Sequence, residues 1–216
     1  MGTTVKAVRH ASAKAFLDRA RTFLMHAELE KNIILGIAAG LVANPGHAKR
    51  ASYFVSVEDG ETVRLCALRT RPRKLVVGRA DREAMVRTLA ADAIYPDLDA
   101  VVGPEPTVTT FALSWAALAG RAFQRGMRQR IYELHEVTHP ISMPGGTLRN
   151  ATSADVGSLI PWVTEFLISI GDKDDPSEMT QQRVADGALF VWDDGGPVSM
   201  AACGGKTPNG VRLSLV

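Results

Sequence analysis

Residues 188–216 constrain the fold most, because two strong turn signals divide this closing stretch into three apolar runs. The turn signals are DDGG at 193–196 and TPNG at 207–210. Glycine and asparagine accept the positive φ angles that tight hairpins require. The pattern predicts three antiparallel strands in a row. The last run, 211–216, is still apolar where the sequence stops, so we expect a longer natural protein that is cut short here.

Two parts of this stretch resemble the GNAT N-acetyltransferase superfamily, and in particular its bacterial two-part members. They are PVSMAA at 197–202 and TPNGVRLSLV at 207–216. In that family the third strand runs into a loop of the form R/Q-x-x-G-x-G/A, which holds the pyrophosphate of acetyl-CoA at a helix N-terminus. The resemblance implies acetyl-CoA as co-substrate, with Leu215 and Val216 orienting its thioester arm. It places the pyrophosphate loop just after Val216.

The two halves of the chain repeat one order of elements. In the first half, helical periodicity at 11–25 and 33–41 precedes strand patterns at 53–57, 63–68 and 75–77. In the second half, a short strand leads to Thr152 and Asp155, spaced as a capping box, and two helical patterns precede the closing strands. A shift of 135 positions, from 54 to 189, aligns the first two strands of each set without gaps. We infer a tandem repeat.

The predicted fold class is α/β, with tandem GNAT-like (acyl-CoA N-acyltransferase) mixed-sheet domains, the second incomplete. Residues 1–139 form a degenerate N-terminal domain that ends in a long strand at 127–137. A linker rich in proline and glycine follows at 140–146. Residues 147–216 form the N-terminal part of the catalytic domain.

The first half does not offer a phosphate site. Where the repeat would place the pyrophosphate loop, the sequence has one glycine, Gly78, beside Asp81 and Glu83. Acidic side chains repel phosphate, and a single glycine does not provide a cradle of backbone amides. We therefore expect the first half to have a structural role.

Candidate site residues lie in the second half. Glu165, near the apolar stripe of a predicted helix, is a candidate general base, although an exposed helix edge explains it equally well. The loop at 171–176 carries Asp172, Asp174 and Asp175, where the resemblance implies the acceptor. These carboxylates could attract a cationic amine, or could belong to a solvated loop.

The sequence HEVTH at 135–139 matches the zinc-protease motif H-E-x-x-H. That chemistry needs a helix, so that both histidines bind one ion. Pro140 disfavours a helix at His139, and on a strand the two histidines would lie about 13 Å apart. No metal site is predicted.

The net charge and the lengths of the apolar runs argue against a nucleic-acid-binding, membrane or secreted protein. The net charge of +2 gives no general reason to bind nucleic acid, and the arginines of 64–87 lack interleaved aromatic residues. No apolar run approaches the ~20 residues that span a bilayer, and no signal peptide precedes the first helix. We expect a cytoplasmic protein that does not bind a membrane.

These observations predict an acetyl-CoA-dependent N-acetyltransferase that acts on a primary amine of a small molecule or peptide. The alternative is a non-catalytic GNAT-like binding or assembly module. We expect the 216-residue chain alone to be inactive, because the pyrophosphate loop and the acid for the leaving thiol would follow Val216. An open strand edge at 213–216 would favour edge pairing into a homo-oligomer.

Overall fold

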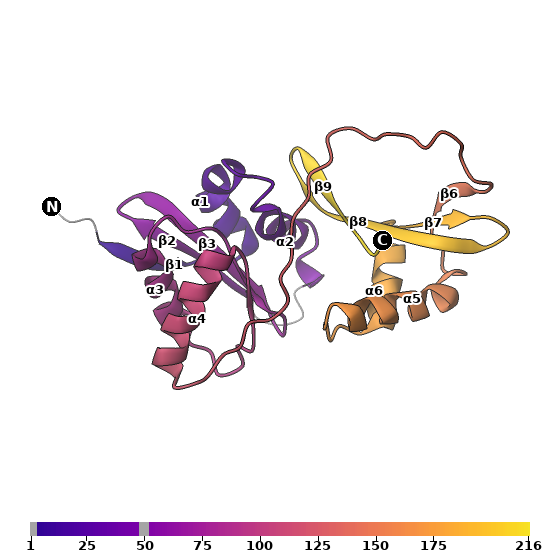
Figure 1. Ribbon diagram of the computed structural model, residues 1–216. Helices are drawn as coiled ribbons and strands as arrows, with labels where there is room; N and C mark the ends of the chain where they lie inside the picture. Colours follow the sequence, from indigo (N-terminus) through magenta and orange to yellow (C-terminus); the bar gives the residue numbers. More distant parts are fainter. Residues whose placement is uncertain (1–3, 48–51) are drawn as a thin grey trace. The chain divides into compact units, whose positions relative to one another are not determined.

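The computed structural model describes residues 4–47 and 52–216, which form a mixed α/β structure with two sheets (Figure 1). Contacts between Cα atoms divide the chain into two compact units. The first comprises Met1–Gly126 with Gly205–Pro208, and the second comprises Met127–Gly204 with Asn209–Val216. Across the described residues, no helix has both the length and the apolar character that a bilayer span requires.

The first unit contains a five-stranded sheet in which spatial order follows chain order. Neighbouring strands are antiparallel except for the last pair, which is parallel. A parallel pair needs a crossover connection, and a helix provides it here. The strands are β1 (Val5–Arg9), β2 (Ser52–Asp59), β3 (Thr62–Thr70), β4 (Leu75–Val77) and β5 (Val101–Val102).

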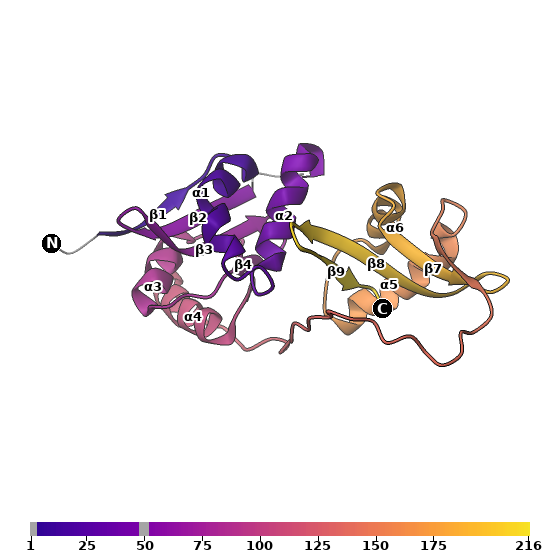
Figure 2. The same cartoon turned by 90° about the horizontal axis from the view of Figure 1, so that it is seen from above.

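Helices cover both faces of this sheet (Figure 2). On one face, α1 (Ala13–Met25) and α2 (Asn32–Ala43) bury Phe16, Leu24 and Ile34 against it, and the short 3-10 helix η1 (Pro45–His47) follows α2. On the other face lie α3 (Glu83–Asp92) and α4 (Glu105–Ala119). The first unit therefore has a core on each side of its sheet.

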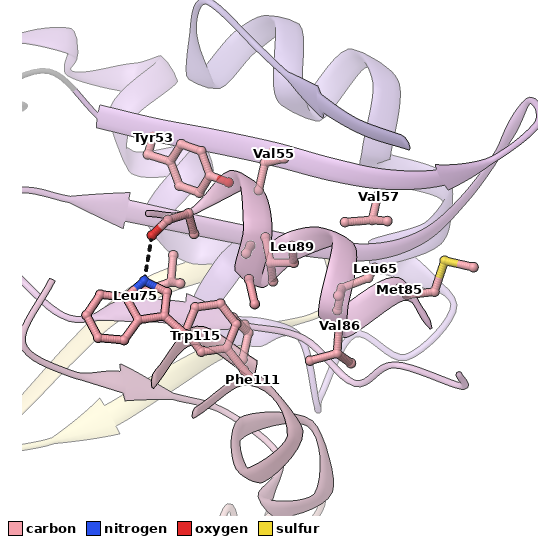
Figure 3. Close-up of a cluster of buried hydrophobic side chains, with 14 of the residues drawn as sticks. Tyr53, Val55, Val57, Leu65, Leu75, Met85, Val86, Leu89, Phe111 and Trp115 are labelled. Carbon is pink, nitrogen blue, oxygen red and sulfur yellow. Dashed lines mark hydrogen bonds between the residues drawn. The ribbon is translucent and has the colours of Figure 1, made fainter. Parts of the chain in front are cut away.

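Figure 3 shows the core between the sheet and α3 and α4. Met85 and Leu89 of α3 and Phe111 of α4 pack against the β-branched residues of the strands. Trp115 is buried there, and its indole nitrogen donates a hydrogen bond of 3.0 Å to the carbonyl of Ala93. A buried indole is tolerated because its polar group has this partner.

The second unit contains a four-stranded sheet whose order again follows the chain, apart from residues 205–207 of that sheet, which belong to the first unit. Both helices of this unit, α5 (Val156–Ser169) and α6 (Pro176–Ala185), lie on the same side of it (Figure 1). Leu159, Val163 and Leu167, at intervals of four, bury one face of α5 against the sheet. The strands are β6 (Thr147–Asn150), β7 (Leu189–Asp193), β8 (Pro197–Thr207) and β9 (Gly210–Ser214).

The two hairpins differ by one residue, so the alignment without gaps is wrong. In the first hairpin Phe54 pairs with Leu68, and in the second Leu189 pairs with Ala202. The shift of 135 positions aligns Leu189 with Phe54, but it aligns Ala202 with Ala67, one residue before Leu68. Both hairpins do change register at aligned positions, after Val57 and after Trp192. The difference arises beyond this register change, where four residues separate Glu58 from its partner Val63 and three separate Asp193 from its partner Pro197. A pattern of apolar residues does not report turn length.

The strand predicted at 127–137 is also wrong. Between Ala119 and Thr147 the described chain contains neither helix nor strand. Apolar side chains of this segment are exposed, including Tyr132 at 82% and Leu134 at 69%. A strand is stable only when a neighbour accepts its backbone hydrogen bonds, and that neighbour cannot be read from local alternation. The linker predicted at 140–146 forms the last part of this longer irregular segment.

Two glycines test how closely β4 and β5 pack. A Cβ at Gly103 would lie 2.3 Å from the carbonyl oxygen of Val77, whereas a Cβ at Gly40, exposed on α2, would meet no atom within 4 Å. We expect Gly103→Ala to lower the free energy of unfolding of the first unit by about 1–3 kcal/mol, because the backbones must separate. Gly40→Ala, the matched control, should raise it by up to ~1 kcal/mol. Hydrogen exchange of β3 and β4 measures both, and equal effects would contradict the packing.

Candidate functional site

The candidate site is a cavity of about 460 Å³ in the second unit. It lies between α5, the first half of β8 and the two residues that follow β9. Its size is typical of sites that hold small molecules. The lining residues are Trp162, Glu165, Phe166, Ser169, Val198, Ser199, Met200, Leu215 and Val216.

Helix α5 forms one wall of the cavity. Its buried stripe, which begins at Leu159, faces the core of the unit. Trp162, Glu165, Phe166 and Ser169 are spaced by three and four residues, so they follow a second stripe along the neighbouring edge of the helix. Trp162 and Phe166 are half-buried, and Glu165 is exposed. On this wall of the open cavity, two aromatic side chains therefore lie beside a carboxylate.

An arginine on β6 fixes the start of α5. Arg149 contacts both carboxylate oxygens of Asp155, at 2.7 and 2.8 Å, and its Nε donates to Asp193 at 2.6 Å. A guanidinium group matches a carboxylate in this two-pronged geometry. The pair joins the edge strand β6 to the first turn of α5 and to the end of β7.

The predicted capping box forms only in part. The backbone amide of Thr152 donates to the Asp155 carboxylate at 2.7 Å, as a capping box requires. The Thr152 hydroxyl, however, donates to the same carboxylate at 2.9 Å instead of accepting from a helix amide. The helix explains the difference, because it begins at Val156 with Asp155 as its N-cap residue, and Thr152 therefore precedes the N-cap by three residues.

The same contacts keep Asp155 deprotonated and Arg149 protonated. The hydrogen bonds from Arg149, followed by the amide of Thr152, hold the pKa of Asp155 well below its usual range. The two carboxylates in turn raise the pKa of Arg149. The ion pair therefore stays charged through the neutral range.

The end of β9 forms the opposite wall. The strand stops at Ser214, so the prediction that it continues to Val216 is wrong. Leu215 has a φ of 55°, which is uncommon for a residue with a side chain, and its side chain is only 2% exposed. Burial of the Leu215 side chain in the core offsets the energetic cost of this φ angle. The positive φ angle turns the chain at the cavity. The open strand edge expected at 213–216 is thus limited to residues up to Ser214.

The cavity brings together three of the residues selected from the sequence, Glu165, Leu215 and Val216. The three aspartates of the 171–176 loop are not among the lining residues that the structure describes. Asp172 accepts hydrogen bonds from the amides of Lys173 and Asp174. Asp175 caps α6, where its carboxylate accepts from the amides of Ser177 and Glu178 at 2.8 and 3.0 Å. Asp175 thus has a structural role.

Sequence reasoning missed the apolar part of the site. Trp162 and Phe166 had been assigned no role in a site, although each lies within three residues of Glu165 on α5. The helical spacing itself could have identified them. Ser199 and Met200 could not be found in this way, because they reach the cavity only through the pairing of β7 with β8.

The first unit offers no phosphate cradle at the position that the repeat predicts. The amide of Gly78 donates to the carbonyl of Cys66 at 2.9 Å, and the amide of Ala80 donates to the Thr107 hydroxyl at 3.0 Å. Arg79 and Arg82 contact Glu30 and Asp59. These residues do not fit a pyrophosphate, because their donors already have partners.

The H-E-x-x-H segment is irregular, so its histidines do not share a helix face. His135 instead contacts Glu133 at 3.2 Å. Within 4–47 and 52–216, no group of three or more potential ligands could hold a metal ion.

Compared with protein-family models, curated proteins and solved structures, the chain gives no match.

The lowered pKa of Asp155 predicts a pH dependence of stability. Its contribution is fully present above its ordinary pKa of 3.8, and is lost as the pH falls through the lower folded-state value. We expect Asp155→Asn to lower the stability of the second unit at pH 7 and to flatten its loss of stability between about pH 5 and pH 2. Asp186→Asn is the control, because that carboxylate is exposed and accepts a hydrogen bond from Gln182. Hydrogen exchange of β6 and α5 reports the result, and an unchanged slope would contradict it.

Proposed function

We propose that the intact protein is an acetyl-CoA-dependent N-acetyltransferase that acts on a primary amine at this cavity. One observation carries the proposal. Glu165, the candidate base, lines the same cavity as Leu215 and Val216, to which the GNAT resemblance assigns the thioester arm. These residues lie about fifty positions apart in the sequence and line one cavity, as a base and a polarising group for this reaction would have to do.

The order of elements supports the GNAT-like and tandem parts of the proposal. In each unit a strand is followed by two helices and then by three strands that form consecutive neighbours in one sheet. The first unit continues with a helix, a parallel strand and a further helix, as the family order does. We propose that the two units are copies of one fold, with the catalytic site in the second.

The chain's own residues would act as follows. Glu165, directly or through a water molecule, takes a proton from the incoming ammonium group, so that the free amine can attack. Backbone amides at the end of β9 polarise the carbonyl oxygen at the carbon under attack. Acetyl-CoA supplies the acetyl group as a thioester. A nitrogen–carbon bond forms, the carbon–sulfur bond breaks, and the second proton that the nitrogen loses passes to the leaving thiolate.

A non-catalytic binding or assembly module is the second candidate. The occupied amides of Gly78 and Ala80 favour this role for the first unit. The two candidates differ in the second unit alone, where only an enzyme requires Glu165 to exchange a proton.

Calorimetric titration of acetyl-CoA tests the proposal. The chain is compared with the full product of its gene. We expect binding and acetyl transfer only where a loop of the form R/Q-x-x-G-x-G/A follows Val216, because the resemblance assigns the pyrophosphate to that loop. Glu165→Gln should lower kcat by about 10²–10⁴-fold without changing the affinity for acetyl-CoA. Glu136→Gln, in the exposed irregular segment, should change neither. Binding in neither form would overturn the enzyme and favour the module.

A further inference from the structure

The cavity has one ionisable side chain among the lining residues that the structure describes, and that side chain is Glu165. Its carboxylate matches one cationic group at the mouth of the cavity. None of the described lining residues is a lysine or an arginine that could receive a carboxylate of the ligand. A free amino acid would therefore bring an unpaired carboxylate close to a second negative charge.

Most of the lining residues are apolar. Trp162 and Phe166 contribute aromatic rings from α5, and Val198, Met200 and Leu215 contribute aliphatic groups and a thioether. A thioether adapts to irregular shapes and packs well against aromatic rings. Trp162 lies three residues before Glu165 on the helix, so its ring is placed to contact a cation held by that carboxylate.

The charges of the lining limit the ligand further. A polyamine would find one carboxylate, that of Glu165, among the described lining residues, and the three aspartates that could pair with its other charges lie outside the lining.

We propose that the acceptor is a primary amine that carries a single apolar, ring-bearing group and no carboxylate. Trp162 and Phe166 determine the specificity for the ring, and Glu165 determines the specificity for the amine. The assignment rests on the proposed function, because it identifies the cavity as the acceptor site.

Binding of the acceptor alone separates the two proposals, since it needs no acetyl-CoA. The probe is phenethylamine, titrated into the chain and followed by NMR and by calorimetry. Phenylalanine tests the added carboxylate, 2-phenylethanol tests the charge and spermidine tests the polycation. We expect phenethylamine to bind about tenfold or more tightly than each of the three, which corresponds to ~1.4 kcal/mol.

Substitutions at Glu165 and Trp162 test whether these residues determine the affinity for phenethylamine. Glu165→Gln should remove the preference for phenethylamine over 2-phenylethanol. Trp162→Ala should weaken both ligands by about tenfold, and Trp162→Phe, which keeps a ring, should restore most of the affinity. Ile168→Ala is the control, because Ile168 lies on the same helix with 73% of its side chain exposed and outside the lining.

Equal binding of phenylalanine, or affinities unaffected by Glu165→Gln and by both Trp162 variants, would overturn the assignment. Selective binding of phenethylamine without acetyl transfer in any form of the chain would support the ligand class. That result would overturn the acetyltransferase and leave a module that binds such amines.

Discussion

The candidate cavity depends on the guanidinium group of Arg149. This one charge joins β6, the first turn of α5 and the end of β7, and α5 carries the cavity wall. The second carboxylate oxygen of Asp193 accepts a hydrogen bond from the amide of Gly196 at 2.9 Å. The carboxylate that pairs with Arg149 therefore also fixes the turn between β7 and β8. A planar guanidinium can do this because its donors point in fixed directions, whereas a lysine ammonium would supply one point charge. The placement of Glu165 follows from this junction.

The first unit uses its buried polar groups differently. Under α1, Ser56 donates to Glu58 at 2.8 Å, Arg19 contacts the same carboxylate at 2.9 Å, and His10 bonds to the Ser56 hydroxyl. Burial lowers the pKa of His10, so the ring favours its neutral form. Because the serine proton points to Glu58, the histidine donates to the serine and does not activate it as a nucleophile. The network satisfies buried groups, which agrees with a structural role for this unit.

Local signals in the sequence predicted most of the second unit. The apolar stripe of α5 and the turn at 193–196 depend on neighbours in the chain, and both are confirmed. Predictions that needed distant partners were wrong, as at 127–137, where no neighbouring strand exists among the described residues. Asp175 illustrates a third limit. A carboxylate that caps a helix and one that attracts an amine have the same sequence, and only the hydrogen bonds to Ser177 and Glu178 distinguish them.

The sheets differ in how many faces their helices cover, and this affects the stability of each unit. The first sheet is packed on both sides, whereas α5 and α6 cover one side of the second. On its other side Leu148, paired with Trp192, is 66% exposed. Less apolar area is removed from water per residue in the second unit, so its folded state has the smaller hydrophobic stabilisation. We therefore expect the second unit, taken by itself, to be the less stable of the two.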